Sequence, residues 1–485
     1  MHSRANTPAR LPVVRYNGRK WNERGDGVTR RPNIIFMISH DTGRQLGCYG
    51  RDVDTPALDA LALEGIRFDQ AFCCAPQCSP SRSGIATGVY PHRNGMMGLA
   101  HIGWSMPVEL PKLPERMAGA GYRTVLVGVQ HEGIEDDRRH GYQRIVKPEK
   151  GRDSAPEVGA LAARTLEELA QGGGDAPFYL AVGFWETHRP FDARRPGMDE
   201  GDRSVPPYLP NHPDICREMG HFAHSARILD DGVRVIVDAV DRLGMAADTL
   251  LVYTTDHGIA FPRAKGTLFD PGLETALIMR WKGTLEAGKQ ISDLVCNVDL
   301  FPTLCELAGA DCDGQEAAQS GAPRAAQGTA ADLPGEGLDG RSFAGALLGR
   351  GEFARDHLFA ELTWHDAYSP VRGIRTRDHK YIRHFARGPS VYIPLDIHTG
   401  LAGQAVREGY YASECVSEEL YDLRSDPHEL VNVAGRPDCA PLQAELRARL
   451  ERWMAQTQDP LLHGPVAGRE APGWANERAS GTMPF

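Results

Sequence analysis

Short apolar runs that alternate with helical patterns constrain this chain more than any other feature of the sequence. Each run is rich in aliphatic and β-branched residues and ends in polar ones, as buried strands do. The five clearest runs are Asn33–Ser39, Thr124–Val129, Phe178–Phe184, Thr249–Thr255 and Thr275–Trp281. Helical patterns lie between them, for example 55–65, 154–172 and a long stretch that ends at Gly244. This order predicts an α/β fold with a large, mostly parallel sheet sandwiched by helices.

The sequence also predicts how the chain divides into parts. A basic arm (1–31) precedes the main α/β domain (32–345), in which an Ala/Gly/Gln-rich stretch at 310–337 is typical of a surface insertion. Antiparallel strand patterns and one helix then predict a smaller α+β subdomain (346–462). An irregular tail (463–485) completes the chain.

Charge and hydropathy exclude several classes of function. The net charge of −10 is spread along the 485 residues, which argues against general nucleic-acid binding. The sequence has no apolar run of the roughly 18 residues that a membrane span requires. The first residues have no apolar core of a secretory signal, so we expect a cytoplasmic protein. The ten cysteines form no C-x-x-C pair, and we expect most of them to be free.

Ionisable side chains follow the predicted strands closely. They are His40 and Asp41 after the first strand, His131 after the second, Glu186, His188 and Arg189 after the third, and Asp256 and His257 after the fourth, with Lys265 nearby. The carboxyl ends of parallel strands meet at one edge of a sheet. Carboxylates and histidines gathered there suit a divalent cation, and neighbouring cationic groups suit a tetrahedral oxyanion.

The stretch CCAPQCSPSRSGIATG, residues 73–88, contributes a cysteine to this picture. Ser79 and Pro80 favour the start of a helix, which puts Cys78 near a helix N-terminus, where anions are stabilised. A cysteine nucleophile of low pKa is reasonable at such a position. Such a nucleophile usually needs a histidine partner and no divalent metal, so these residues alone leave the chemistry of Cys78 open. Cys73 and Cys74 are expected to be packing residues.

The same stretch strongly resembles the signature of the type I sulfatases, of the alkaline-phosphatase-like superfamily. The signature Cys-x-Pro-Ser-Arg followed by Thr-Gly is present as Cys78–Arg82 with Thr87 and Gly88. Further segments resemble the family in the expected order, from RPNIIFMISHDTGRQLGCYG through TTDHG, AKGT and NVDLFPTLCELAG to ELYDLRSDPHELVNVAG. The resemblance covers roughly 32–453 and implies the alkaline-phosphatase-like fold.

This resemblance implies a mechanism and a role for each matched residue. The cysteine of the signature is oxidised to Cα-formylglycine by a formylglycine-generating enzyme, and the hydrated aldehyde attacks sulfur. A divalent metal, by family default Ca²⁺, assists this attack. By match, the metal ligands are Asp41, Asp256, His257 and residue 78. Arg82 would hold residue 78 and the metal site, His131 would be the base of the elimination step, and His188 with Lys265 would bind sulfate and assist the leaving group.

Two positions depart from the family pattern. Position 40, where the family often has aspartate, is His40, which we expect to be either a metal ligand or, by a slight preference, a group that supports the ligands. Imidazole is softer than carboxylate, so Mn²⁺ and Zn²⁺ are alternatives to Ca²⁺. Position 129, where a sulfate-binding lysine is often found, is Val129. Lys265, Arg189 or a residue of the second domain would have to compensate for that lysine.

Within the family, the sequence is most similar to heparan N-sulfatases (sulfamidases). The segments FWETHRPF, ELTWHDAYSPVRGIRT and HFARGPSVYIPLDI carry this likeness, and it implies an N-sulfoglucosamine-type substrate. His365 and Arg372 are candidate sugar-binding residues, with domain packing as the equal alternative. A phosphodiester or phosphonate monoester hydrolase of the same superfamily and, more remotely, a non-catalytic anion or glycan binder are the alternative functions.

Overall fold

The computed structural model describes most of the chain. The described residues are 31–133, 140–149, 153–172, 175–191, 203–312 and 337–469. The predicted arm, nearly all of the predicted insertion and the end of the predicted tail lie outside these ranges. The boundaries of these parts therefore stay predictions.

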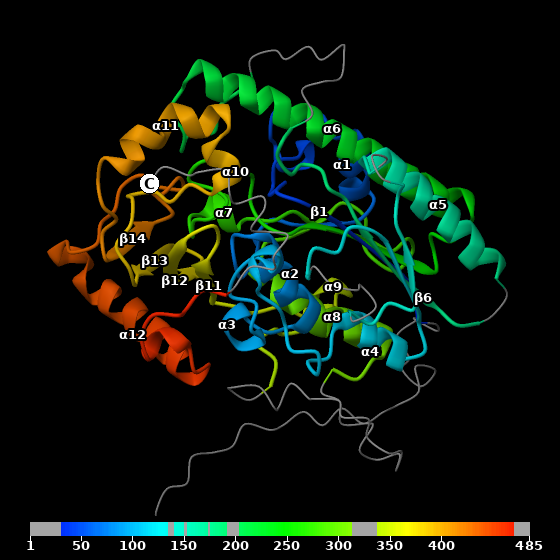
Figure 1. The fold of residues 1–485 in the computed structure, drawn as a ribbon. Coiled ribbons are helices and arrows are strands. Elements are labelled where there is room, and N and C mark those ends of the chain that lie inside the picture. The colour runs from blue at the N-terminus through cyan, green and yellow to red at the C-terminus, as the bar shows by residue number, and fades with distance from the viewer. Residues whose placement is uncertain are drawn as a thin grey trace, which may run out of the picture.

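The main sheet has eight strands, and its middle is parallel as the sequence predicted (Figure 1). In spatial order the strands are β5 (Arg144–Val146), β4 (Arg123–Gly128), β6 (Phe178–Gly183), β1 (Asn33–Ser39), β7 (Thr249–Thr255), β8 (Leu277–Arg280), β2 (Ile66–Phe68) and β9 (Lys289–Ile291). A two-stranded sheet pairs β3 (Ala71–Phe72) with β10 (Val295–Cys296). Four of the five predicted strands, β1, β4, β6 and β7, are thus adjacent and parallel.

The fifth predicted strand does not run parallel to the other four. The predicted run 275–281 forms β8, which pairs antiparallel with both β7 and β2. A parallel return to the same sheet needs a crossover connection, usually a long helix. The connection from β7 to β8 contains only the four-residue helix α7 (Asp270–Leu273), so the chain turns back beside β7.

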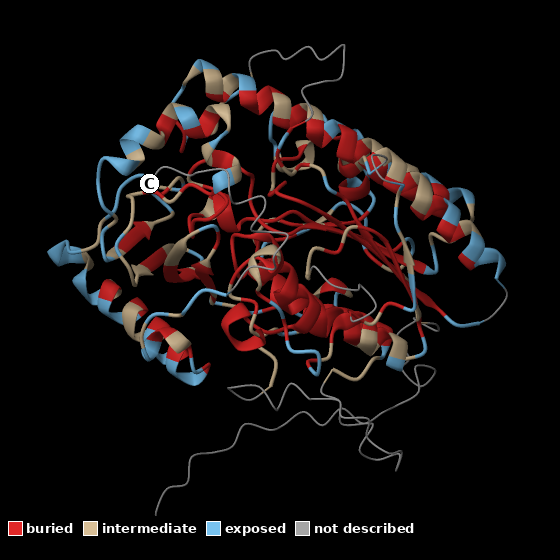
Figure 2. Cartoon of the chain, in the orientation of Figure 1, coloured by how far each residue is buried: buried red, intermediate tan, exposed pale blue. Residues whose placement is uncertain are grey.

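Helices cover both faces of the main sheet, because both faces of its strands are apolar. In β1, Ile35 and Met37 pack on the side of α1, α5 and α6, and Ile34, Phe36 and Ile38 pack on the side of α2, α4 and α8. Figure 2 shows the buried strands between the two helical layers. The helices of the first layer are α1 (Pro56–Leu63), α5 (Ala155–Gln171) and α6 (Pro213–Arg242). Those of the second layer are α2 (Cys78–Thr87), α4 (Leu113–Gly119) and α8 (Leu300–Ala308), with the short α3 (Pro91–Asn94) and α9 (Ala344–Leu347) nearby.

The C-terminal part forms a second, antiparallel sheet, as predicted. Its strands are, in order, β11 (His357–Trp364), β12 (Tyr368–Thr376), β13 (His379–His384) and β14 (Glu418–Asp422). The remaining helices are α10 (Leu395–His398), α11 (Leu401–Tyr411) and α12 (Ala440–Gln456). One apolar cluster joins Cys73 and Cys74 of the main part to Ile374 of this sheet and Leu450 of α12. The two parts therefore share a core, and the prediction of Cys73 and Cys74 as packing residues is confirmed.

Two further expectations concern the cysteines and membrane spans. All ten cysteines, each within the described ranges, are free thiols. Of the helices that the structure describes, none combines the length and the apolar character needed to cross a membrane.

Candidate active site

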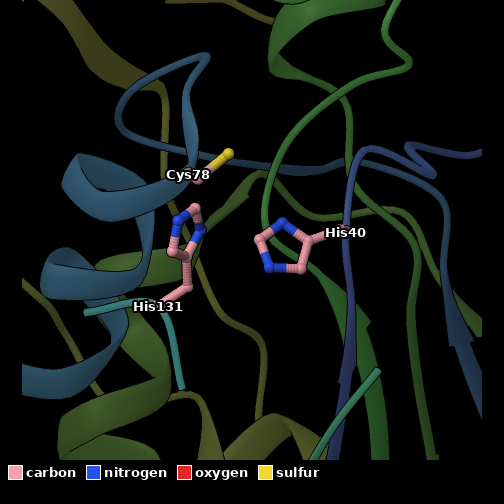
Figure 3. A group of neighbouring side chains, drawn as sticks. All are labelled: His40, Cys78 and His131. Carbon is pink, nitrogen blue, oxygen red and sulfur yellow. The ribbon is translucent and has the colours of Figure 1, made fainter. Parts of the chain in front are cut away.

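The ends of β4, β6, β1 and β7 bring the predicted ionisable groups to one edge of the main sheet. These four strands are neighbours and run in the same direction, so the residues that follow them converge. Cys78 joins them from the first residue of α2, beside His131 and opposite the His40 ring (Figure 3). Sheet topology thus brings together His40, Asp41, His131, His188, Asp256 and His257, whereas Glu186 accepts from the backbone N–H of Ala155.

Asp256 is the centre of the hydrogen-bond network. Its Oδ1 accepts from the backbone N–H groups of Asp41 and His257, both at 2.9 Å. Its Oδ2 accepts from Arg82 Nε at 3.0 Å. Burial alone would raise the pKa of this carboxyl, but the charges of His257 and Arg82 outweigh burial and hold its pKa well below the usual range. Asp256 is therefore a fully buried carboxylate anion.

Asp41 presents a second buried carboxylate. Its Oδ1 lies 3.1 Å from His257 Nε2, and its Oδ2 accepts from Lys265 Nζ at 2.8 Å. Burial raises the pKa of Asp41, but the charges of Lys265 and His188 lower it by more than burial raises it. The net pKa is therefore well below the usual value. Asp41 has a φ of 53°, a backbone conformation that disfavours a side chain and that surrounding contacts must hold in place. Such conformations cluster at functional sites.

Cys78 points into this group of charges from the N-terminus of a ten-residue helix. Its Sγ lies 3.4 Å from His257 Nε2 and 3.8 Å from Asp41 Oδ1, and the residue is 2% exposed. Burial raises the pKa of the thiol, but Lys265 and His257 outweigh burial and lower the pKa well below its usual value. Residue 78 therefore stands where negative charge is stabilised.

Arg82 lies one helical turn after Cys78 and ties α2 to the strand ends. Besides Asp256, it donates to the carbonyl of Ser39 at 3.1 Å and to that of Gln130 at 3.3 Å. Its side chain is 1% exposed, and these contacts account for its guanidinium. Arg82 thus links α2 to Asp256 and to the residues that follow β1 and β4, and its role in the reaction stays a prediction.

Lys265 is held between two carboxylates, one of which the sequence analysis missed. Its Nζ donates to Asp41 Oδ2 and to Asp396 Oδ2, both at 2.8 Å. Burial lowers the pKa of Lys265, but Asp396 and Asp41 raise it well above the usual value, so the ammonium stays charged. Asp396 lies on α10, 131 residues after Lys265 in the sequence, and the residues around it form no catalytic motif.

Two histidines of the site have pKa values that are shifted in opposite directions. Burial, as the largest effect, lowers the pKa of His131 to about 4, so its imidazole is neutral at pH 7. Burial lowers the pKa of His188 as well, but the Asp41 carboxylate offsets this effect and the net pKa is raised. The environments of these two imidazoles thus separate their pKa values.

Trp185 is a second residue that the sequence analysis did not single out. Its ring centroid lies 4.8 Å from that of His188 and 5.1 Å from that of His40, and the residue is 37% exposed. It therefore forms a wall of the site. A large aromatic residue directly after a strand whose neighbours are ionisable is the signal that could have revealed it.

The structure does not bring Arg372 and Arg189 to the site as substrate-binding residues. Arg372 is fully buried in an ion pair with Asp459, with Nε 2.5 Å from Oδ2, and it also donates to two backbone carbonyls. Arg189 donates to Glu218 and to the carbonyl of Ala260, and it stacks over aromatic rings. Both arginines satisfy buried carboxylates, which is the structural alternative that sequence alone could not exclude.

His365 lies beside Asp366, close to a large cavity. Its Nδ1 lies 2.9 Å from Asp366 Oδ2, and its ring centroid is 6.3 Å from that of Tyr392. The cavity has a volume of about 1260 Å³, and Asp366, Tyr392 and Gly266 line it. Gly266 is the residue next to Lys265 in the chain. The sugar-binding role of His365 stays a prediction.

Comparisons with known proteins identify the family of this site. The family profile described as Sulfatase matches residues 32–310, which is more than half of the chain. The chain belongs to the sulfatase family. The type I sulfatase assignment, the fold and a sulfuric ester hydrolase activity follow from this match together with the site and the relatives below.

Curated relatives extend over nearly the whole chain. An "Ulvan-active sulfatase" of Formosa agariphila is 25% identical over 488 residues, covering 89% of this chain and 76% of the relative. The "N-sulphoglucosamine sulphohydrolase" of Homo sapiens is 27% identical over 486 residues, covering 90% of this chain and 92% of the relative. "Arylsulfatase A" of Homo sapiens is 27% identical over 503 residues and covers 92% and 93%.

Solved structures confirm the sulfatase fold. A putative sulfatase from Bacteroides fragilis superposes with a TM-score of 0.68 at 18% identity, over 94% of this chain and 100% of that one. The structure "BT4656 in complex with its substrate D-Glucosamine-2-N, 6-O-disulfate" superposes with a TM-score of 0.64 at 19% identity, over 90% and 99%.

Proposed function

We propose that this sulfatase hydrolyses a sulfate ester or sulfamate of a sugar, of the N-sulfoglucosamine type, with residue 78 in its formylglycine form. The observation that carries the proposal is the position of Cys78. It begins a helix, is nearly inaccessible, and faces Asp41, His257 and Lys265. A site of this kind stabilises negative charge at residue 78 and on a group bound beside it.

The residues present also fit a divalent cation. His40, Asp41, Cys78 and Asp256 each offer one ligand atom, these atoms all lie within 4.8 Å of one another, and all four residues are buried. His257 touches the same group from the other side, with Nε2 3.1 Å from Asp41 Oδ1. We propose Asp41, Asp256, His257 and residue 78 as ligands. Two carboxylates favour a hard ion such as Ca²⁺, and the imidazoles make Mn²⁺ and Zn²⁺ the alternatives to test.

Each bound group supplies one element of the chemistry. The hydrated aldehyde of residue 78 supplies an oxygen nucleophile that attacks sulfur. The cation supplies positive charge, which lowers the pKa of that nucleophile. Binding of the transferred group and the proton transfers are then carried out by the side chains around residue 78.

The side chains divide the work by charge. The Lys265 ammonium, fixed by Asp41 and Asp396, faces the position of the transferred group and binds its negative oxygens. Of the residues considered as substitutes for a lysine at Val129, Lys265 has the geometry and Arg189 does not. Neutral His131 accepts the proton of residue 78, and His188, whose pKa is raised, donates a proton to the leaving oxygen or nitrogen.

The substrate class rests on the relatives and on space beside the site. A human relative is named N-sulphoglucosamine sulphohydrolase, and one similar structure was described with a sulfated glucosamine. The 1260 Å³ cavity is lined by tyrosines, including Tyr368, Tyr392 and Tyr411, by the cations Arg387 and Arg407, and by the acids Asp366, Glu408, Glu414 and Glu419. Aromatic side chains suit the faces of a sugar ring, so we assign the leaving group to this side.

The test is a substrate panel on protein whose residue 78 has been verified as formylglycine by peptide mass spectrometry. The panel pairs N-sulfoglucosamine, O-sulfated glucosamine and a phosphonate monoester, and Cys78→Ala is the control. We expect turnover of a sulfated sugar that the Cys78→Ala variant loses. A preference for the phosphonate would replace the proposal with the related hydrolase activity, and equal turnover by Cys78→Ala would overturn the role of residue 78.

A further inference from the structure

The part of the site around His40 contains two imidazoles, those of His40 and His131, whereas a hard cation prefers oxygen ligands. His40 is fully buried; its Nδ1 faces the Asp256 carboxylate, and its Nε2 has no hydrogen-bond partner among the described residues. A buried imidazole nitrogen without a partner is costly, and it is uncommon unless a ligand satisfies it. His131 Nδ1 is a second buried nitrogen that lacks a partner within the same described part of the chain.

These two histidines and Cys78 form a compact group. One ligand atom from each of His40, Cys78 and His131 can be chosen so that all lie within 4.8 Å of one another. The two imidazole centroids are 4.9 Å apart and tilted by 57°, and Figure 3 shows both rings near Cys78. The three residues come from just after β1, the start of α2 and the residues after β4.

We propose that the unconverted protein, with a thiol at position 78, binds one thiophilic divalent cation of the Zn²⁺ class through Cys78, His40 and His131. One thiolate and two imidazoles are a donor set typical of zinc sites that keep a fourth position open. A tetrahedral ion with bonds of about 2.0 to 2.3 Å holds its ligand atoms about 3.6 Å apart, so the group must close by ~1 Å.

The surroundings of His40 support this assignment. His40 Nδ1 lies 3.1 Å from Asp256 Oδ2, a carboxylate that the Arg82 guanidinium holds in place. A carboxylate beside one nitrogen of a metal-binding histidine orients the other nitrogen toward the ion. The site also depends on sulfur, because conversion of Cys78 to an aldehyde removes the soft ligand. Binding and conversion therefore exclude each other at residue 78.

Co²⁺ spectroscopy and Zn²⁺ competition test the proposal on the full chain. Protein made without a formylglycine-generating enzyme carries the thiol, and the converted protein of identical sequence is the control. We expect a thiolate-to-Co²⁺ charge-transfer band from the thiol form and no such band from the converted form. In competition with a chromophoric chelator, we expect the thiol form to bind one Zn²⁺ about 100-fold or more tightly than Cys78→Ser does.

Variants separate this site from the carboxylate site. His40→Gln and His131→Gln should each weaken Zn²⁺ binding by the thiol form at least tenfold. Cys48→Ser, which removes a cysteine outside the group, should leave the band and the affinity unchanged. The proposal is overturned if the thiol form gives no charge-transfer band or if Cys78→Ser retains it. None of these results depends on sulfatase turnover, so the proposed function can stand or fall separately.

Discussion

Asp396 is the site residue whose role rests most directly on tertiary structure, and Asp396→Asn tests it. The substitution keeps the shape of the side chain and removes its charge. Lys265 Nζ then keeps Asp41 Oδ2, now 2.8 Å away, as its one charged partner. We expect the ammonium to shift toward Asp41 and to bind the transferred group less well.

The expected loss follows from the strength of one charged hydrogen bond. Such a bond contributes about 1.5 to 3 kcal/mol, and the 21% exposure of the Asp396 side chain places this one near the lower end. A loss of about 1.5 to 2 kcal/mol in transition-state stabilisation lowers kcat/KM by about 10- to 30-fold. The unfolding midpoint should change by no more than about 2 °C, because Lys265 remains paired.

The assay is steady-state turnover of the best sulfated sugar by formylglycine-verified protein. Asp238→Asn, which neutralises an exposed carboxylate on α6, is the matched control and should retain full kcat/KM. In a Lys265→Met background, Asp396→Asn should cost little more, because the partner is already gone. Unchanged kcat/KM in Asp396→Asn, or additive losses in the double variant, would refute the positioning role.

Three further predictions test the acid–base groups, a buried arginine and the cation. In a pH–rate profile, kcat/KM should fall below about pH 4, where His131 becomes protonated, and should fall again at high pH as His188 loses its proton. The His131→Gln variant should lose the fall on the acid side. An acid side identical to that of the parent protein would contradict the role of His131. Arg372→Met should lower the free energy of unfolding by about 3 to 5 kcal/mol in denaturant titration, because it leaves the buried Asp459 carboxylate without its ion pair. The kcat per folded molecule should not change. A selective rise in KM would instead support a sugar-binding role for Arg372. Dialysis against a chelator should abolish turnover, and stepwise return of Ca²⁺, Mn²⁺ or Zn²⁺ should identify the ion; full activity of metal-free protein, verified by elemental analysis, would exclude the cation.

The strands and the convergence of the site were readable from sequence because local patterns are strong there. Apolar runs such as Asn33–Ser39 match the observed strand in both bounds, since a strand buried on both faces leaves no polar position inside it. The rule that chemistry gathers at the carboxyl ends of parallel strands then placed His40, Asp41, Asp256 and His257 together. The helix start at Cys78 was equally local, given by Ser79 and Pro80.

Local sequence patterns did not predict which acidic residue pairs with each buried arginine. A buried arginine can bind a substrate or balance a carboxylate, and the choice depends on which distant acid the fold brings to it. Asp459 takes Arg372, and Glu218 takes Arg189, through contacts that no spacing rule encodes. The direction of β8 likewise depended on how the short connection after β7 packs.

The sequence by itself thus determined the helix start at Cys78, the order of the strands along the chain and the set of strand-end groups, because each is encoded in neighbouring residues. Only the tertiary structure decided that Asp396 shares Lys265 with Asp41, that Trp185 walls the site, and that the two arginines lie elsewhere. It also decided that His40 lies near Cys78 and His131, with its Nδ1 at Asp256 and its Nε2 without a partner among the described residues. The physical reason is that a buried charge or imidazole takes its function from its nearest neighbours, and folding chooses those neighbours from anywhere in the chain.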